Sequence, residues 1–207
     1  MTYGAAMSYP PRQNIDDDPA FVRRIMADYG FALLVVEGLH ATQLPLLWRD
    51  EGPEGTLYGH LARNNPICDH LDGGAALAVF SGPHGYVSAQ LYDDPTVHVP
   101  TWNYASVQLR GRLQSLPDEH VLPHLNDMTQ AYEGPDGWAV ADAKAYVAAL
   151  QNGIRAFRLV VETCQPLRKM SAKAGPAMQK RIIDAARMRG EHAFADEMTR
   201  IMKKETP

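Results

Sequence analysis

The chain has 207 residues, of which 45% are hydrophobic and 21% charged, a composition typical of one folded domain with a substantial core. Its first 18 residues lack the basic start and apolar middle of a signal peptide, and no apolar run approaches the roughly 18–20 residues of a membrane span. The two cysteines, Cys68 and Cys164, are far apart, which argues against a disulfide framework and a zinc site. The sequence therefore predicts a cytoplasmic protein without membrane contact.

Charge is distributed unevenly along the chain. Residues 168–204 hold ten basic and four acidic residues, a net charge of +6. Since the whole chain carries −4, the remainder carries −10. The basic side chains could bind DNA or cofactor phosphates, or could form the solvent-exposed faces of terminal helices. Their spacing at helical intervals, without clustering, favours the second interpretation.

The predicted elements begin with one helix and continue as a series of short strands. The helix is expected over Asp16–Tyr29, with an aspartate N-cap and Pro19 in its first turn, and Gly30 ends it. Pro45 places the second strand at a sheet edge or at a bulge. The strands, separated by turns rich in glycine and proline, are expected over Phe31–Glu37, His40–Trp48, Thr56–Leu61, Ala75–Phe80, Tyr86–Leu91 and Trp102–Leu113.

The second half of the chain is mainly helical. Helices are expected over Asp118–Tyr132, Ala141–Leu150, Pro176–Met188 and Glu191–Lys203, and one further strand over Ile154–Val161. Short strands at this spacing are typical of a small antiparallel barrel. We therefore predict an α+β fold, with a barrel domain over residues 1–165 that carries inserted helices. A C-terminal helical extension is expected over residues 166–207.

Two segments carry polar and aromatic side chains where a strand core would have Val, Ile or Leu. They are residues 99–111 (VPTWNYASVQLRG) and residues 59–66 (GHLARNNP). A buried polar side chain without a partner costs about 1–3 kcal/mol. Asn103, Gln108 and Arg110 are therefore expected either on a solvated face or paired with another group. Two such segments in one small domain favour a planar, anionic cofactor as that group.

His60 stands near the end of a predicted strand. The small residues Gly59 and Ala62 permit close approach of a ligand to the backbone, and Arg63 offers a planar fork to a phosphate or carboxylate. The alternative is a turn with a solvent-exposed arginine and a capping asparagine. His84 is expected in a second turn, and the same two interpretations apply to it.

Trp102, Asn103 and Tyr104, in the segment over residues 99–111, also allow two interpretations. Trp102 and Tyr104 alternate with Asn103, so both rings lie on one side of the predicted strand. A core aromatic pair accounts for these rings as well as a cofactor platform does.

Lys169 and Ser171 follow the last predicted strand in a loop, from which the lysine could reach an anionic group.

Five segments, taken in chain order, carry a resemblance to the PaiB family of FMN-binding split-barrel proteins. They are residues 41–46 (ATQLPL), 59–66 (GHLARNNP), 80–88 (FSGPHGYVS), 100–104 (PTWNY) and 169–171 (KMS). The resemblance spans nearly the whole chain. It implies a six-stranded antiparallel split barrel with peripheral and C-terminal helices, a homodimer, and FMN or b-type haem at the dimer interface. The family role that it implies is transcriptional regulation.

The resemblance also implies which side chains face the cofactor. They are His60, Ala62, Arg63, Asn65, Trp102, Asn103, Arg110, Lys169 and Ser171.

The chain departs from the family pattern beside this expected site. Gln43 and Gln108 stand where the family usually has His, and Cys68 and Leu91 where it usually has Trp. Residues 172–174 (AKA) replace a frequent Gln-Asn-Arg. A divergent branch of the family, the piperazate synthases, binds b-type haem in place of FMN and joins two nitrogens of N-hydroxyornithine into a cyclic hydrazine.

By resemblance to that branch, His60 is the expected axial iron ligand, and Arg63, Arg110 or Lys169 would neutralise the haem propionates. The iron would act as a Lewis acid on the N-hydroxyl group, which then leaves as the neighbouring amine attacks. Three functions stay open. They are a cofactor-binding regulator that could contact DNA, a haem-dependent enzyme that forms an N–N bond in a small amino-acid-like substrate, and an FMN-dependent oxidoreductase.

Overall fold

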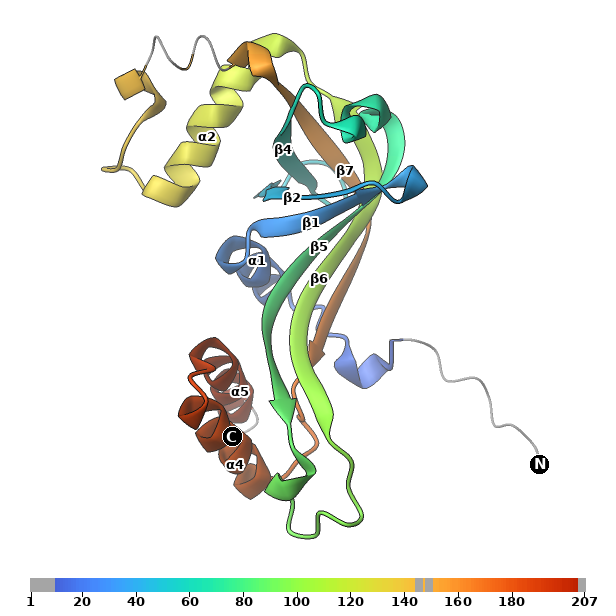
Figure 1. The fold of residues 1–207 in the computed structure, drawn as a ribbon, viewed down its shortest axis with the longest axis vertical. Helices are drawn as coiled ribbons and strands as arrows, with labels where there is room; N and C mark the ends of the chain where they lie inside the picture. The colour runs from blue at the N-terminus through green and yellow to red at the C-terminus, as the bar shows by residue number, and fades with distance from the viewer. Residues whose placement is uncertain (1–9, 144–146, 148–150, 205–207) are drawn as a thin grey trace, which may run out of the picture. The chain divides into compact units, whose positions relative to one another are not determined.

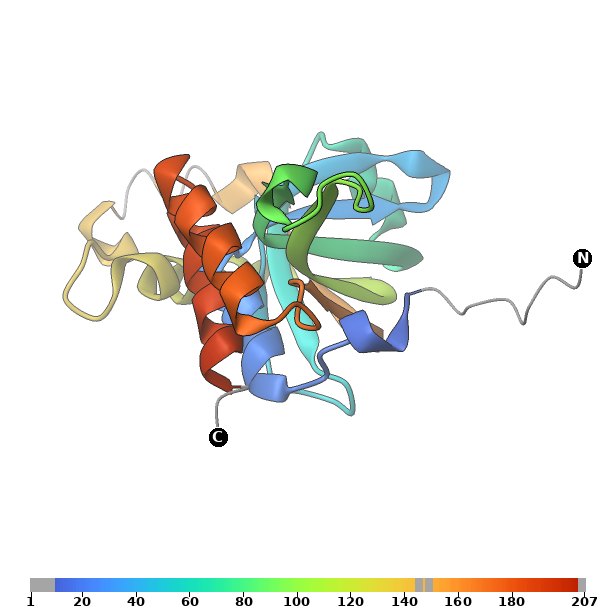
Figure 2. The ribbon, with the colours of Figure 1, turned by 90° about the horizontal axis from the view of Figure 1, so that it is seen from below.

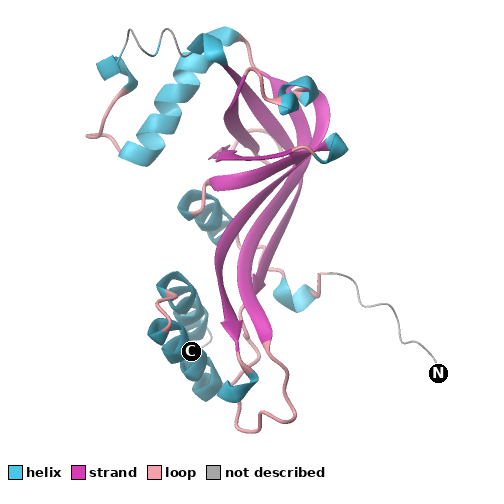
Figure 3. Cartoon of the chain, in the orientation of Figure 1, coloured by secondary structure: helices cyan, strands magenta, loops and turns pink. Residues whose placement is uncertain are grey.

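The structure, a computed structural model, describes residues 10–143, 147 and 151–204. Its strands form a seven-stranded sheet in the order β2-β1-β5-β6-β7-β4-β3 (Figure 1). The strands are β1 Phe31–Val36, β2 Ala41–Pro45, β3 Leu47–Arg49, β4 Thr56–Ala62, β5 Asp72–Val87, β6 Thr101–Ser115 and β7 Ile154–Lys169. The helices are α1 Pro19–Asp28, α2 Val121–Glu133, α4 Pro176–Met188 and α5 His192–Lys204 (Figure 3). The pairs β1–β2, β1–β5, β3–β4 and β4–β7 are antiparallel, which confirms the predicted α+β class with an antiparallel sheet.

The chain forms two compact units, each assembled from segments that are distant in sequence. Unit 1 comprises Met1–Ile25, Ser81–Val107 and Gln165–Pro207. Unit 2 comprises Met26–Phe80 and Gln108–Cys164. The long strands β5, β6 and β7 contribute residues to both units. The domain boundary expected after residue 165 remains a prediction.

Helix α1 begins at Pro19, three residues later than the sequence predicts. Asp18 caps it, because its Oδ1 accepts a hydrogen bond from the backbone N–H of Ala20 at 2.9 Å. Asp16 is free of the helix, and its carboxylate pairs with Arg168 of β7. The expected aspartate cap and first-turn proline are thus confirmed, with a different aspartate as the cap.

The single strand expected over residues 40–48 is two strands. β2 pairs with β1 and β3 pairs with β4, and these two short strands form the edges of the sheet. Pro45, which has no N–H to donate, ends β2, as expected for proline at a sheet edge. The buried Leu46 lies between the strands and donates its backbone N–H to the carbonyl of Gly30 at 3.0 Å. The sheet has seven strands, whereas the family resemblance implies six.

One long strand replaces the two short strands expected in the middle of the chain. β5 continues through Gly82 and Pro83, and residues 89–91 form a 3₁₀ helix. Burial alternates along β5 but changes phase at Gly82 and Pro83, as it does at a β-bulge. A Cβ atom on Gly85 would lie 2.2 Å from a ring carbon of Phe194 on α5. The glycines and the proline that suggested a turn therefore have other roles within the strand. The burial alternation shifts by one residue at Gly82 and Pro83, and Gly85 allows close packing against Phe194.

The two C-terminal helices agree closely with the prediction. α4 has the expected bounds, and α5 begins and ends one residue later than expected. The two helices lie side by side (Figure 2). Their predicted apolar faces are buried in unit 1 through Met178, Ile182, Phe194, Met198 and Ile201.

Helix α2 follows a 3₁₀ turn over Asp118–His120, so the predicted helix over residues 118–132 is largely confirmed. A 3₁₀ helix over Val140–Ala143 opens the next predicted helix, and six of the following residues lie outside the described part of the chain. In unit 2 the sheet core is built from large apolar side chains, including Leu34, Leu57, Phe80 and Phe157. Within the described residues, no helix is both long and apolar enough to cross a membrane.

Candidate functional site

Unit 1 contains a pocket formed by the start of β6, the end of β7 and the loop that follows β7. Its volume is about 310 Å³, at the lower end of the roughly 300–1,000 Å³ typical of small-molecule sites. Ten residues line it: Gln13, Asn14, Thr101, Asn103, Arg168, Lys169, Met170, Ser171, Ala172 and Lys173. Three of these residues are basic and none is acidic, so the pocket suits an anionic group.

Asn103 and Ser171 fix one wall of this pocket. Asn103 is fully buried, and its Nδ2 donates to the Ser171 hydroxyl at 2.9 Å. The hydroxyl donates back to Asn103 Oδ1 at 3.2 Å. Ser171 has a φ of +53°, in the left-handed region that non-glycine residues seldom adopt. The paired hydrogen bonds hold the serine in this conformation and so fix the path of the loop after β7.

The two lysines of the pocket make hydrogen bonds to neutral groups. Lys169 donates to the Thr101 hydroxyl at 2.6 Å, and Lys173 donates to the side-chain carbonyl of Gln13. Among the described residues, neither ammonium group has a carboxylate partner. Their charges are therefore available to an anionic ligand.

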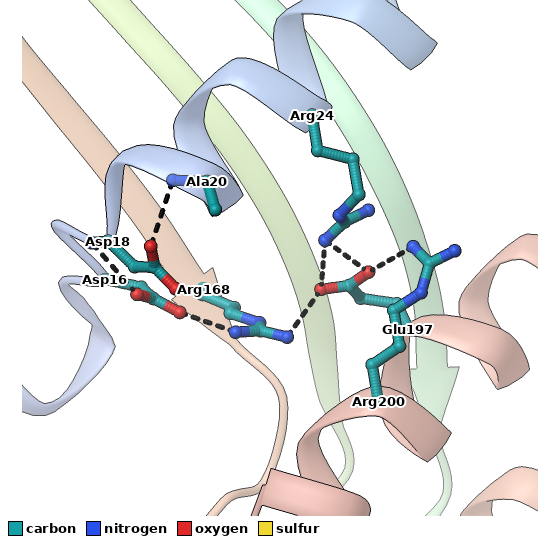
Figure 4. Close-up of polar contacts among 7 residues, drawn as sticks. All are labelled: Asp16, Asp18, Ala20, Arg24, Arg168, Glu197 and Arg200. Atoms are coloured by element: carbon teal, nitrogen blue, oxygen red, sulfur yellow. Dashed lines mark hydrogen bonds and ion pairs between the residues drawn. The ribbon is translucent and has the colours of Figure 1, made fainter.

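Arg168 joins the pocket to a buried ionic cluster (Figure 4). Its side chain is 8% exposed, with Nη1 2.5 Å from Asp16 Oδ2 and Nη2 2.9 Å from Glu197 Oε1. Glu197 is fully buried and also pairs with Arg24 at 2.8 Å and with Arg200 at 3.5 Å. The cluster therefore holds three guanidinium groups around one buried carboxylate, with Asp16 as the second acid.

The third nitrogen of the Arg168 guanidinium, Nε, is left without a partner. Its Nε atom is buried and makes no hydrogen bond within the described part of the chain. The guanidinium stacks over the ring of Phe21, with Cζ 4.9 Å from the ring centroid. A buried donor without an acceptor costs about 1–3 kcal/mol. The two carboxylates and the Phe21 ring hold the guanidinium in place although this donor has no acceptor.

Trp102 lies on the face of β6 opposite to Asn103 and does not line the pocket. It is 56% exposed, and Tyr86 of β5 is 41% exposed. The Trp102 ring lies near those of His84 and Tyr86, with centroids 6.3 and 5.9 Å apart. His84 belongs to β5 and not to the turn expected from the sequence. The three rings form an exposed aromatic cluster on unit 1.

In unit 2, His60 of β4 contacts a histidine that the sequence analysis did not single out. His60 Nδ1 lies 3.0 Å from Nε2 of His124 on α2, and the two rings meet edge to face. Burial lowers the pKa of His60. Burial and the neighbouring His60 lower the pKa of His124 to about 4. Both rings are therefore neutral near pH 7. The sequence signal was present, since His124 shares an apolar helix face with Val121 and Met128.

The other predicted residues of unit 2 have partners of their own. Arg63 pairs with Asp118 at 2.6 Å and donates Nε–H to the backbone carbonyl of Asn152 at 2.7 Å. Asn65 caps the 3₁₀ helix Pro66–His70, because its Oδ1 accepts from the backbone N–H of Ile67 at 2.9 Å. These contacts match the alternative of a capped turn for this segment.

The nine predicted residues thus fall into two groups. Asn103, Lys169 and Ser171 line the pocket of unit 1, and Trp102 lies on the opposite face of β6. His60, Ala62, Arg63, Asn65 and Arg110 belong to unit 2. Arg110 is exposed and bonds to the side-chain carbonyl of Gln108 at 3.3 Å. Ala62 is exposed at the end of β4.

Several basic residues of α4, α5 and the turn between them are paired with acids. The pairs are Lys180–Asp184, Arg181–Asp93, Arg189–Glu191 and Arg200–Glu197. Paired charges attract phosphates less strongly than free ones do. This arrangement agrees with the interpretation of the C-terminal charges as solvated helix faces.

The antiparallel sheet with its helices has the fold of the split-barrel proteins. The chain belongs to the FMN-binding family whose description is "Putative FMN-binding domain", and the family model matches residues 8–163.

Relatives of known name support this assignment. Protease synthase and sporulation protein PAI 2 of Bacillus subtilis is 28% identical over 173 residues, which cover 79% of each chain. The predicted resemblance to the PaiB family is thereby confirmed. The flavocytochrome Anf3 from Azotobacter vinelandii has a TM-score of 0.58 at 15% identity, covering 79% of this chain and 71% of that one. The FAD and haem binding protein from Mycobacterium smegmatis has a TM-score of 0.54 at 14% identity, covering 75% and 73%. These two structures share the fold.

Proposed function

We propose that the protein binds a planar cofactor with an anionic arm, FMN or b-type haem, and that the pocket of unit 1 receives the anionic group. The charge of the pocket carries this proposal. Lys169 and Lys173 line it and bond only to neutral groups, while the third basic residue, Arg168, is paired with Asp16 and Glu197.

The pocket volume supports a binding mode in which only the anionic arm of the cofactor enters the pocket. A volume of about 310 Å³ suits an anionic arm better than a complete ring system with its arm. The rings would then lie outside the pocket. Following the family resemblance, we propose that a second copy of the chain covers them in a homodimer. The exposed Tyr86 and Trp102 give unit 1 apolar surface that a partner or a ring system could cover.

An absorbance spectrum of the purified protein, followed by titration with FMN and with haem, tests the proposal. Lys169→Met removes the charge but keeps most of the length of the side chain. Loss of a charge-assisted hydrogen bond corresponds to about 10-fold to 100-fold weaker binding. Lys180→Met is the matched control, because this exposed lysine pairs with Asp184 on α4 and does not line the pocket. Equal affinities of the wild type and Lys169→Met would contradict the proposal.

A second candidate function is supported by one specific observation, the hydrogen bond that orients His60. With Nδ1 held by His124, the Nε2 atom of His60 has no hydrogen-bond partner among the described residues. A neutral imidazole with one open nitrogen is the usual protein ligand of haem iron. This candidate is a haem-dependent enzyme of the N–N bond-forming type, in which bound iron would supply a Lewis acid. A Soret band after haem loading that is lost in His60→Ala would support it, and no Soret band in the loaded wild type would exclude it.

The family resemblance also suggests a regulatory role in transcription. Direct DNA binding would depend on phosphate contacts, and its affinity would fall steeply as the salt concentration rises. The ion pairs within α4 and α5 lead us to expect no such binding by these helices. A gel-shift titration at low and high salt with the full chain tests this expectation, and salt-sensitive retardation of DNA would contradict it.

A further inference from the structure

We propose that residues 11–16, the N-terminal strap, close one side of the pocket of unit 1, and that Gln13 is a positioning residue for Lys173. Closure of the strap and binding of an anion in the pocket then strengthen each other. This inference rests on the proposed function, because it concerns the anion that the pocket receives.

The end of the strap is fastened to β7. The backbone of Ile15 forms an isolated antiparallel bridge with the buried Leu167. The next residue, Asp16, pairs with Arg168 at 2.5 Å, and Glu197 holds the same guanidinium at 2.9 Å. These contacts keep the strap beside the last residues of β7, which also line the pocket.

A 3₁₀ turn over Arg12–Asn14 brings the middle of the strap to the pocket. Two hydrogen bonds close the turn, from the backbone N–H groups of Asn14 and Ile15, with lengths of 2.8 and 3.1 Å. Gln13 and Asn14 then line the pocket. The strap therefore forms a wall of the pocket and is held there by contacts outside it.

Gln13 fixes one of the two pocket lysines without cancelling its charge. Lys173, in the loop after β7, donates to the side-chain carbonyl of Gln13. An ammonium group has three donors, so this bond leaves two for a ligand. Lys169 is held in the same way by the hydroxyl of Thr101. A lysine that is already held loses less side-chain entropy when an anion binds, so the neutral partner favours binding.

Calorimetric titration of the full chain with inorganic phosphate and with acetate, at equal ionic strength, tests the role of Gln13. We expect Gln13→Ala to bind the anion about 3-fold to 10-fold more weakly, the factor for one neutral hydrogen bond. Gln90→Ala is the matched control and should keep the wild-type affinity. Gln90 is also the exposed middle residue of a 3₁₀ helix in unit 1, and it does not line the pocket. Equal affinities of Gln13→Ala and the wild type would overturn the inference, and so would tighter binding, which would mean that Gln13 competes with the anion.

Hydrogen exchange of the Asn14 and Ile15 amides reports closure of the strap itself. Coupling is reciprocal, so a saturating anion should slow this exchange in the wild type by the factor that Gln13→Ala loses in affinity. Gln13→Glu separates position from charge. Its carboxylate still accepts from Lys173, so the exchange in the free protein should stay slow, but the anion should bind more weakly because the ammonium is neutralised. Wild-type affinity in Gln13→Glu would contradict the need for a neutral partner.

The possible failures separate this inference from the proposed function. Wild type that binds phosphate or acetate, with the same exchange at Ile15 in the free and bound states, overturns the strap and leaves the anion pocket standing. Wild type that binds neither anion overturns the anion pocket, and the strap's role in binding with it. Lys169→Met, which changes the pocket but not the strap, should weaken binding and leave the exchange of the free protein unchanged. Faster exchange in this variant would show that the strap does not close independently of the pocket cations.

Discussion

Replacement of Glu197 by alanine probes the buried ionic cluster of unit 1. The change removes a fully buried carboxylate and leaves Arg168, 8% exposed, with Asp16 as its remaining acid. Removing one partner of a buried ion pair typically costs about 3–5 kcal/mol. The other two arginines can turn to solvent, since Arg24 is 25% and Arg200 54% exposed. We therefore expect the lower end, a loss of about 3 kcal/mol in the free energy of unfolding.

Urea unfolding followed by circular dichroism measures this loss, and thermal unfolding should show a Tm lowered by about 6–12 °C. The control is Glu191→Ala, which breaks an ion pair with Arg189 in which both side chains are about one-third exposed. Exposed pairs contribute about 0–1 kcal/mol, so this variant should stay near the wild type. Equal losses in the Glu197 and Glu191 variants would refute the assignment of a buried cluster.

Three further predictions concern other parts of the chain. Burial lowers the pKa of His60, and that of His124 to about 4, so both rings are neutral in the folded state. In the unfolded chain both histidines are protonated below about pH 6.5. The free energy of unfolding therefore has its full contribution from the neutral rings above that pH. It should fall by about 3 kcal/mol on account of His124 as the pH drops to about 4. Urea unfolding across this range should show the fall, and a flat profile would contradict it. Gly85→Ala places a methyl group against the Phe194 ring and should cost about 1–3 kcal/mol in thermal unfolding; unchanged stability would show that the contact relaxes freely. Ser171→Ala should destabilise the protein by about 1 kcal/mol more than Ser171→Gly, because only glycine adopts the positive φ without strain. Equal Tm values for these two variants would argue against strain in this loop.

The helices were predictable because their signals are local. α4 and α5 follow from apolar residues at helical spacing, with Pro176 at the first position of α4. The edge position of β2 follows from Pro45, whose missing N–H is a property of that residue alone. Each of these predictions depends on residues within one or two turns of chain, and none needs knowledge of a distant partner.

β5 was not predictable as one strand, because the reason for a glycine at position 85 is a contact with a residue far away in the sequence. In sequence, Gly82 and Pro83 have the composition of a turn, and Gly85 strengthens that pattern. In the structure, Gly85 packs against Phe194, more than one hundred residues later. A contact of this kind leaves no local signal. The same composition therefore suits a turn and a tightly covered strand equally well.

The pocket was predictable in part. Asn103 stood out as a polar residue in a strand, and it is fully buried and paired with Ser171, another predicted residue. Arg168 was counted only among the basic residues, although it lines the pocket. His124 was missed because its partner, His60, lies 64 positions away. A single histidine on an apolar helix face carries no indication of which residue it meets.

Whether a basic residue can bind an anionic ligand depends on whether a carboxylate of the folded protein already pairs with it. The sequence shows a surplus of positive charge over residues 168–204 but cannot say which charges are already balanced. Arg168 is neighbour to Lys169, yet Asp16 and Glu197 hold its guanidinium, and only its Nε is left without a partner. Lys169 bonds to a neutral hydroxyl and keeps its charge. Because the acids that distinguish these two neighbours come from α5 and from the segment before α1, anion binding depends on the folded unit. A peptide that contains only the loop after β7 should therefore bind phosphate no more tightly than its isolated charges allow.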